Sequence, residues 1–382
     1  MEPLLMETEY EKPLVLVVDD DPTNLRILVS KLNREYRLGV AKSGTKALEY
    51  MGKQIPDLVL LDVMMPDMDG YETIKIMRER GYVLPVVALT AHAMQSDKQR
   101  CLDAGMDAYL SKPFKQALLF DTIHSLLPEY YRVPEAQAES PARPSVPDAE
   151  SWAFLPPCFS LETVIQTGLS PQQYPSILQS FARNHAQDAA LFRHAVRTHD
   201  WESLRERAHA LKGASANLGA LHLRDMARTL ELEAQSQLDK GYPNAALSTL
   251  QGRPLAALLP ELEEALGEVL EAAAKLCPSD KETKPADGPS AIASKPKLDI
   301  AKLGTYYNDL VEALLQAAPG RIRIALGSLL VICNADEYPL LHTLKMHVDN
   351  YDYEAALTVL ERIRPSLFSS SAPSTEPSDA AQ

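Results

Sequence analysis

Cysteine is scarce in this 382-residue sequence, and its four copies are widely separated. Cys101, Cys158, Cys277 and Cys333 form no CxxC pair. In a cytosolic chain this distribution indicates thiols outside any zinc site or disulfide framework. We therefore assign the cysteines no functional role.

Long apolar runs and excess positive charge are also missing. No stretch approaches the roughly 18 apolar residues of a membrane span, and the acidic segment 1–13 lacks the basic start of a signal peptide. We therefore expect a cytoplasmic protein without membrane insertion. The formal net charge of -14 argues against a nucleic-acid partner, because such binding needs a basic surface. A glycine-rich nucleotide loop is absent too, so we expect no ATP-binding kinase domain.

Composition and length indicate several globular domains. Hydrophobic residues make up 46% of the chain and charged residues 24%, which is typical of soluble proteins, and the length suits about two or three domains. Stretches rich in proline, alanine and serine predict linkers and a disordered tail. The predicted boundaries are 1–130, 131–149 (linker), 150–276, 277–297 (linker), 298–368 and 369–382 (tail).

The first piece alternates short apolar runs with amphipathic segments. The runs are LVLVV at 14–18, LVLL at 58–61, VVAL at 86–89 and AYL at 108–110. Such runs, separated by segments of helical length, indicate buried parallel strands in a fold that alternates strands and helices. The other two pieces show helical periodicity, which predicts all-α structure.

Polar residues follow these runs, at the ends of the predicted strands. Asp19 and Asp20 follow the first run, Asp62 the second, Thr90 the third and Lys112 the fourth. The carboxyl ends of parallel strands meet at one edge of a sheet, so these side chains should lie together. Neighbouring carboxylates repel one another unless a cation is bound, and all-oxygen ligation suits Mg²⁺. A phosphoryl group would then be met by Mg²⁺, the Lys112 ammonium and the Thr90 hydroxyl.

Four motifs carry a resemblance to a known family: VVDDDPTN, LLDVMMPDMDG, ALTAHAM and SKPF. Over roughly residues 12–127 the sequence resembles the response-regulator receiver domains, which implies a doubly wound, flavodoxin-like fold. The resemblance implies that Asp62 is the phosphoacceptor. It also implies that Asp20, Asp62 and the carbonyl of Met64 bind Mg²⁺, with Asp19 acting through a water molecule.

The same resemblance assigns further roles. It implies that Thr90 and Lys112 hold the phosphoryl oxygens, that Tyr109 is the aromatic switch residue, and that the Lys112-Pro113 bond is cis. His92 falls where the family varies, so the lifetime of the aspartyl phosphate is not predicted.

Two residues near this site have simpler interpretations. Asp21 matches no ligand position and is predicted to be a helix cap or a turn residue. Gly70 is predicted to be a turn residue that needs an unusual backbone conformation. We assign no chemistry to either.

One histidine in the second piece stands in an unusual setting. On a helix with about 100° per residue, Leu204, Leu211 and Leu218 share one face and His209 lies well outside it. His209 is therefore predicted to face water. Gly213 follows one turn later, although glycine weakens a helix by up to about 1 kcal/mol. Its absent side chain would leave room for a partner's active site beside the imidazole.

The stretch from His209 to Gly213 has the form HxxKG and, with its context over about 161–273, resembles the histidine phosphotransfer domains. The resemblance implies an antiparallel four-helix bundle with His209 as a second phosphoacceptor. Lys212, at i+3, would oppose the charge of the phosphorylated ring, and Gly213 and Ala216 would form the docking surface. The other histidines of this piece are interpreted as ordinary surface or boundary residues: His185, His194, His199 and His222.

The third piece, 298–368, carries the weakest signals. Its segment from Asp352 echoes the helix start at Asp200, and this alignment places Glu361 where His209 stands, with no lysine-glycine pair after it. The piece is therefore either a degenerate phosphotransfer-like bundle or an ordinary helical hairpin that binds a partner or a second copy. We favour the hairpin.

Two hypotheses about function follow. In the first, the chain is a phosphorelay intermediate: Asp62 takes a phosphoryl group from a sensor histidine kinase or another phosphohistidine donor, and His209 exchanges one with its own or another receiver domain. In the second, only the receiver domain is chemically active and the helical domains dock partners. In both, the chain is not an ATP-dependent enzyme and borrows its phosphate, and a larger hybrid kinase is a context that would suit it.

Overall fold

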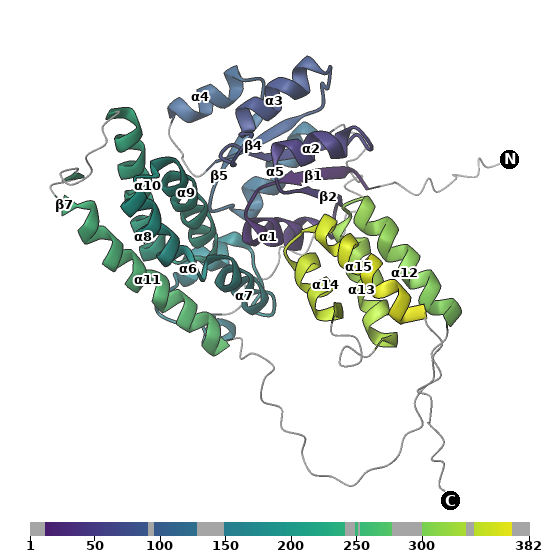
Figure 1. Ribbon diagram of the computed structural model, residues 1–382. Helices are drawn as coiled ribbons and strands as arrows, with labels where there is room; N and C mark the ends of the chain where they lie inside the picture. Colours follow the sequence, from purple (N-terminus) through teal and green to yellow (C-terminus); the bar gives the residue numbers. More distant parts are fainter. Residues whose placement is uncertain are drawn as a thin grey trace, which may run out of the picture. The chain divides into compact units, whose positions relative to one another are not determined.

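The computed structural model describes residues 12–90, 95–127, 149–240, 249–250, 253–276, 300–333 and 340–368. The predicted linkers, apart from Ala149, lie outside the described residues, as do the predicted tail and His92. The chain divides into two compact units, Met1–Gly288 and Pro289–Gln382. Figure 1 traces the elements of both units along the chain.

Five parallel strands form a sheet in the first unit, in the order β2-β1-β3-β4-β5. Their bounds are β1 Leu14–Val18, β2 Arg37–Ala41, β3 Leu58–Asp62, β4 Val86–Thr90 and β5 Ala108–Ser111. Strands β1, β3 and β4 are buried along their whole length, as their apolar runs predict. The strand order confirms a doubly wound, flavodoxin-like α/β fold.

Among the five strands of this sheet, β2 alone has no counterpart among the apolar runs. Its sequence, RLGVA, begins with an exposed arginine and contains Gly39, so it lacks the continuous apolar pattern of the central strands. Glycine is needed here because a Cβ on residue 39 would lie 2.4 Å from the ring of Tyr50. The strand lies at the edge of the sheet, beside β1.

Helices connect the strands of this domain: α1 Pro22–Leu32, α2 Gly44–Met51, α3 Gly70–Glu79, α4 Gln95–Asp103 and α5 Gln116–Leu126. At the start of α1, the side chain of Asp21 accepts hydrogen bonds from the backbone N–H groups of Thr23 and Asn24, and Pro22 stands in the first turn. The prediction that Asp21 caps a helix is confirmed.

Gly70 begins α3 directly beside the end of β3. Its N–H donates to the carbonyl of Val63 at 2.9 Å, and a Cβ on residue 70 would lie 2.5 Å from the carbonyl oxygen of Asp62. Gly70 is not among the glycines with positive φ, so the predicted unusual conformation is wrong. Glycine is required by the close approach of two backbone segments, which positions the strand end that carries Asp62.

A helical domain completes the first unit. Its described elements are a 3-10 helix Ala149–Trp152, α6 Leu161–Thr167, α7 Tyr174–His185, α8 Asp188–Thr198, α9 Trp201–Leu218, α10 Leu221–Lys240, β6 Thr249–Leu250, β7 Arg253–Pro254 and α11 Leu255–Leu276. Helices α7 to α11 contact one another around a shared hydrophobic core, which confirms the predicted all-α class. The short antiparallel pair of β6 and β7 is not predicted by the helical periodicity.

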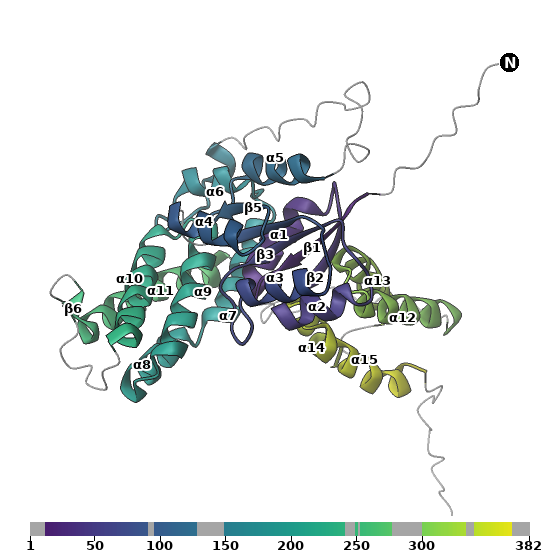
Figure 2. The ribbon, with the colours of Figure 1, turned by 90° about the horizontal axis from the view of Figure 1, so that it is seen from above.

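Helix α1 of the sheet domain packs against α7 and α9 of the helical domain (Figures 1 and 2). Ile27 on α1 is fully buried and belongs to the same hydrophobic cluster as Phe181 and Leu211 of the bundle. The sequence predicts two separate folded pieces here. In the structure, they share an apolar contact within one compact unit.

The second unit contains four helices within the described residues 300–333 and 340–368: α12 Ile300–Leu315, α13 Pro319–Ile332, α14 Leu340–Asp349 and α15 Tyr353–Phe368. Helix α12 contacts α13 and α15, and α14 contacts α13 and α15. Each helix buries an apolar face, which includes Leu310, Leu329, Leu344 and Leu360. The unit is therefore larger than the helical hairpin that the sequence favours. Glu361 lies exposed on α15.

None of the helices that the structure describes is both long enough and apolar enough to cross a membrane.

We expect Gly70→Ala to lower the free energy of unfolding of the sheet domain by about 1–3 kcal/mol, the usual cost of forcing atoms into packed space. The added Cβ would meet backbone atoms, so α3 would have to move away from β3. Gly267→Ala on α11 is the matched control, because nothing lies within 4 Å of its Cβ position and alanine favours a helix. Chemical unfolding followed by circular dichroism measures both, and equal midpoints would contradict this prediction.

Candidate functional site

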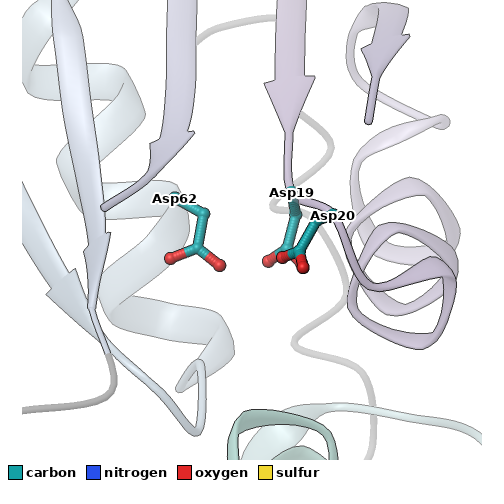
Figure 3. A group of neighbouring side chains, drawn as sticks. All are labelled: Asp19, Asp20 and Asp62. Atoms are coloured by element: carbon teal, nitrogen blue, oxygen red, sulfur yellow. The ribbon is translucent and has the colours of Figure 1, made fainter. Parts of the chain in front are cut away.

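Three carboxylates gather at the carboxyl edge of the sheet (Figure 3). Asp19 and Asp20 follow β1, and Asp62 ends β3. The two strands are paired side by side, with Val18 opposite Leu61. One oxygen from each carboxylate lies within 4.8 Å of the others. The sheet therefore brings together acids that are far apart in the sequence.

The ammonium of Lys112 joins this cluster from the loop after β5. Its Nζ donates to Asp19 Oδ2 at 2.8 Å and to Asp62 Oδ2 at 2.6 Å. The backbone N–H of Lys112 donates to the carbonyl of Thr90 at 2.7 Å, and Thr90 is buried at the end of β4. The Lys112-Pro113 bond is cis, as predicted. The structure thus brings the predicted acids, threonine and lysine to one place.

Burial and mutual repulsion govern the charge of this cluster. Burial raises the pKa of Asp19 well above its usual value, and Lys112 opposes that shift. Burial, followed by the nearby Asp62 carboxylate, raises the pKa of Asp20 to about 7. A bound divalent cation would relieve this repulsion, and a donor set of carboxylate oxygens fits Mg²⁺. Met64 lies beside the cluster, since its N–H donates to Asp62 Oδ1 at 3.3 Å.

Tyr109 lies on β5, two residues before Ser111, which is paired with Thr90 of β4. Its side chain is half-buried, and the Nζ atom of Lys98 lies 5.1 Å from its ring centroid. This cation contact holds the ring near α4.

His209 occupies the middle of α9 and is buried, with 5% of its surface exposed. The prediction that it faces water is wrong. The helix itself is oriented as predicted, because Leu204, Leu211 and Leu218 are fully buried in the core of the bundle. The difference arises because the sheet domain covers the opposite side of α9.

Gly213 lies against the cluster of the sheet domain. A Cβ on this residue would lie 3.4 Å from Cδ of Lys112 and 3.6 Å from Nδ2 of Asn24. Ala216, one turn further along α9, is also buried. A methyl group at residue 213 would thus be in ordinary contact with Lys112, and a longer side chain would be crowded there.

Glu231 on α10 holds the imidazole of His209. Its Oε1 lies 2.6 Å from His209 Nδ1, and its Oε2 accepts a hydrogen bond from Lys212 Nζ. Lys212 Nζ also lies 3.5 Å from His209 Nδ1. Glu231 is not predicted from the sequence, because the pairing of α9 with α10 that places it opposite His209 is a tertiary contact.

The protonation of this group follows from its surroundings. Burial lowers the pKa of His209, and the hydrogen bond to Glu231 only partly offsets that effect. Burial would raise the pKa of Glu231, but its contacts with His209 and Lys212 lower it to about 2. The carboxylate is therefore ionised beside a neutral ring. An ionised carboxylate only accepts hydrogen bonds, so the proton of the ring lies on Nδ1 and Nε2 carries the lone pair.

A cavity of about 300 Å³ separates the two sets of residues. The sheet domain lines it with Asp20, Met64, Met65, Pro66 and Asp69, and the helical domain with Ser203, Arg205, Glu206, Arg207, His209 and Ala210. The acidic edge of the sheet and the histidine of α9 therefore open onto the same space.

Two family models match the chain. Residues 15–124 match the response regulator receiver domain, and residues 176–272 match the Hpt domain. The chain therefore contains a receiver domain followed by an Hpt domain, which confirms both resemblances found in the sequence. The sheet domain is the receiver domain, and the helical domain that follows it is the Hpt domain.

Several known proteins are similar to part of the chain. Sensor histidine kinase RcsC of Salmonella typhimurium LT2 is 45% identical over 111 residues, which are 29% of this chain and 12% of the kinase. Signal transduction histidine-protein kinase BarA of Escherichia coli K12 is 38% identical over 120 residues, 30% of this chain and 12% of the kinase. The chain thus spans a small part of the length of these relatives.

Among solved structures, the receiver domain of a sensor histidine kinase from Pseudomonas aeruginosa PAO1, with a magnesium ion in its active site cleft, is 36% identical. The match covers 30% of this chain and 97% of that one, with a TM-score of 0.29.

Histidine nitrogen NMR of the full-length chain tests the arrangement around His209. We expect His209 to titrate below the usual histidine pKa, because burial disfavours its charged form, with the neutral ring protonated on Nδ1. Glu231→Leu should lower the pKa of His209 further, since it removes a carboxylate that favours the charged ring, and should let the proton occupy either nitrogen. His185, whose pKa is raised to about 9, is an internal reference. A higher pKa for His209 in the variant would contradict the assignment.

Proposed function

We propose that the chain is a phosphorelay protein in which Asp62 accepts a phosphoryl group and exchanges it with His209 of the same chain. The observation that carries this proposal is the shared cavity of about 300 Å³, which Asp20, beside Asp62, lines from one domain and His209 from the other. The position of Gly213 beside Lys112 supports it, because helix α9, which carries His209, lies against the lysine that pairs with Asp62.

The receiver side of the reaction is assigned as follows. Asp19, Asp20 and Asp62, with the carbonyl of Met64, would hold Mg²⁺, which when bound supplies positive charge facing the phosphoryl oxygens. Lys112 already pairs with Asp62 at 2.6 Å and would move from the carboxylate to a phosphoryl oxygen. Together with the hydroxyl of Thr90, its ammonium stabilises the charge that the phosphoryl group carries during transfer.

The Hpt side supplies the nucleophile. Nε2 of His209 attacks the phosphorus, the bond from phosphorus to the Asp62 oxygen breaks, and Asp62 recovers its carboxylate. No proton has to leave Nε2, because the proton of the neutral ring already lies on Nδ1. The Nδ1–H group donates a hydrogen bond to Glu231 Oε1 and keeps its proton. Glu231 is thus a positioning residue. Lys212, paired with Glu231, opposes the negative charge of the phosphorylated ring.

A phosphohistidine donor would load Asp62, since RcsC and BarA, two relatives of the chain, are histidine kinases and the proposed chemistry includes no use of ATP. The donor is therefore a sensor histidine kinase or another phosphohistidine protein, and further receiver domains are the other partners. Tyr109 would move inward with Thr90 on phosphorylation and release its contact with Lys98. We place this exchange in the cytoplasm, where such kinases obtain ATP.

Labelling the full-length chain tests the two acceptors. With radioactive acetyl phosphate and Mg²⁺, we expect a base-labile acyl phosphate on Asp62 and then a base-stable phosphohistidine. Asp62→Asn should abolish both signals, because His209 receives its phosphate from Asp62. His209→Gln should retain the first signal and lose only the second.

Removal of Mg²⁺ by a chelator should reduce labelling of Asp62 to background, since the carboxylates would repel the incoming phosphate. Base-stable label in the His209→Gln chain would refute His209 as the acceptor. If the native chain labels on Asp62 alone in the presence of other phosphorylated receivers, only the receiver is chemically active and the chain is a binding switch.

The contact at Gly213 gives a separate prediction. Gly213→Glu should lower phosphohistidine formation at least about tenfold, because the Cβ position is already 3.4 Å from Lys112 and the larger side chain would force the domains apart. Labelling of Asp62 should persist, and helix content should hold, since glutamate favours a helix over glycine. Gly267→Glu, on α11 with open space around it, is the matched control. Equal phosphohistidine yields from the two variants would rule out docking through Gly213.

A further inference from the structure

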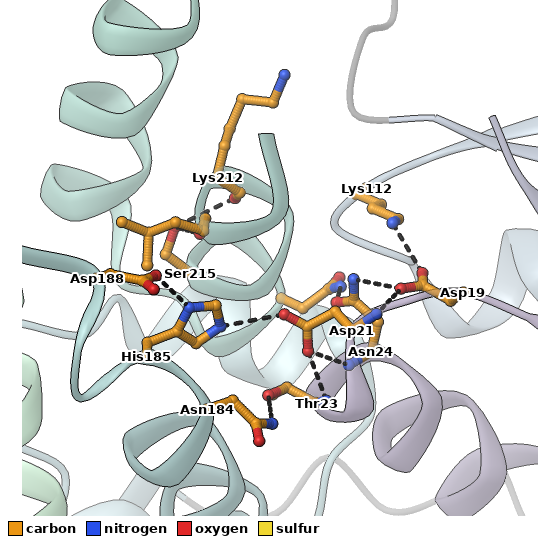
Figure 4. A network of polar contacts seen from close by, with 12 residues as sticks. Asp19, Asp21, Thr23, Asn24, Lys112, Asn184, His185, Asp188, Lys212 and Ser215 are labelled. Atoms are coloured by element: carbon orange, nitrogen blue, oxygen red, sulfur yellow. Dashed lines mark hydrogen bonds and ion pairs between the residues drawn. The ribbon is translucent and has the colours of Figure 1, made fainter. Parts of the chain in front are cut away.

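Three ionisable side chains form a buried group across the contact between the receiver and Hpt domains (Figure 4). His185 is the last residue of α7, Asp188 begins α8, and Asp21 caps α1 of the receiver. All three are at most 5% exposed. The prediction that His185 is an ordinary surface or boundary residue is therefore wrong. Asp188 is only three residues away in the sequence, but Asp21 lies in the other domain, and that contact is not visible in the sequence around His185.

The two oxygens of Asp21 serve two different domains. Oδ1 accepts from the N–H of Thr23 at 2.6 Å and caps α1. Oδ2 lies 3.1 Å from His185 Nε2, and His185 Nδ1 lies 2.7 Å from Asp188 Oδ2. Both ring nitrogens therefore face carboxylate oxygens, which is the environment of a charged, doubly donating imidazolium.

Electrostatics agrees with this geometry. Burial alone would lower the pKa of His185, but the hydrogen bonds to Asp188 and Asp21 outweigh it and raise the pKa to about 9. The ring of Phe181 lies beside His185, with 4.5 Å between centroids, and limits its rotation.

Further polar contacts surround this group at the start of α1. Asn184 Nδ2 lies 3.4 Å from Thr23 Oγ1, and Asn217 Nδ2 donates to Asn24 Oδ1 at 2.8 Å. Asn24 in turn donates to Asp19 Oδ1 at 3.1 Å. The Hpt domain therefore contacts Asp21, Thr23 and Asn24, which are three of the four residues that follow Asp19 and Asp20.

Asp21 has no part in the chemistry proposed above, and its cap of α1 is complete without His185. The pair of His185 and Asp188 is likewise complete within the Hpt domain. The contact between Asp21 and His185 is thus needed by neither fold. The contact instead affects how well a receiver domain binds the Hpt domain. A receiver without a hydrogen-bond acceptor at this position would leave one N–H group of the charged His185 ring buried and unpaired, which weakens binding.

We propose that His185, oriented by Asp188, is a specificity-determining residue. It selects receiver domains that have a carboxylate directly after the two acids that correspond to Asp19 and Asp20. This inference rests on the proposed exchange between Asp62 and His209. The partner that fits the surface is a receiver domain whose first helix is capped by aspartate, and the receiver of this chain is the first such partner.

A double-mutant cycle in the full-length chain tests the proposal. The four chains are the native one, His185→Gln, Asp21→Asn and the double variant. Asparagine caps helices as well as aspartate does, so α1 is retained, and circular dichroism verifies the helix content of each chain. Each chain receives radioactive acetyl phosphate with Mg²⁺, and the rate of formation of base-stable phosphohistidine is compared with base-labile label on Asp62. His222→Gln, at an exposed histidine on α10, is the matched control.

We expect each single variant to form phosphohistidine about tenfold more slowly, which corresponds to about 1.4 kcal/mol, with Asp62 labelled as in the native chain. The double variant should be no slower than the slower single variant, because both substitutions remove one contact. Native rates in His185→Gln, or multiplying effects in the double variant, would overturn the proposal. If the native chain itself forms no phosphohistidine, the proposed function fails instead, which is a different outcome.

Discussion

Electrostatic crowding at the carboxyl edge of the sheet is the constraint on which the first unit depends. Asp19, Asp20 and Asp62 are brought together by the pairing of β1 with β3, and two unit charges 4 Å apart repel by about 4 kcal/mol at an effective dielectric of 20. Lys112 offsets part of this repulsion by bonding two of the acids. The loop after β5 must therefore hold the ammonium of Lys112 at this edge of the sheet.

The same constraint extends into the Hpt domain through hydrogen bonds. Asn24 donates to Asp19 and accepts from Asn217 of α9, and the side-chain oxygen of Asn217 accepts from the backbone N–H of Phe114 at 3.2 Å. Asn217 of the Hpt domain thus contacts both the start of α1, beside the acid cluster, and the loop after β5 that carries Lys112. Because buried polar groups need partners, the position of α9 is tied to the positions of these loops.

The sequence predicts the parts of the molecule that depend on local pattern. The central strands appear as continuous apolar runs, and the residues at their ends converge because parallel strands share an edge. Strand β2 does not follow this pattern, because Gly39 interrupts its apolar residues. The ring of Tyr50 occupies the space beside this glycine. The helical phase of α9 is also predicted correctly from Leu204, Leu211 and Leu218.

What the sequence does not predict depends on contacts between elements. The phase of α9 tells which side of His209 faces the bundle, but only the docked receiver domain shows that its other side is covered. Glu231 and His185 look like ordinary polar residues, because their partners lie on other helices or in another domain. Helical periodicity also gives no sign that four helices pack together in the second unit, since periodicity shows which face of a helix is apolar but not which helix covers it.

The position of Gly213 beside Lys112 also has a consequence for the order of the phosphoryl transfers to and from Asp62. Helix α9 lies there against the lysine that pairs with Asp62, so under the proposed function a donor kinase and the Hpt domain would compete for this edge of the receiver. Loading and unloading of Asp62 would then alternate, with one separation and one reassociation of the domains in every cycle. The strength of the contact between α1 and the Hpt helices would set the frequency of that cycle. A tighter contact would slow the separation of the domains and therefore lower the number of phosphoryl groups transferred per unit time.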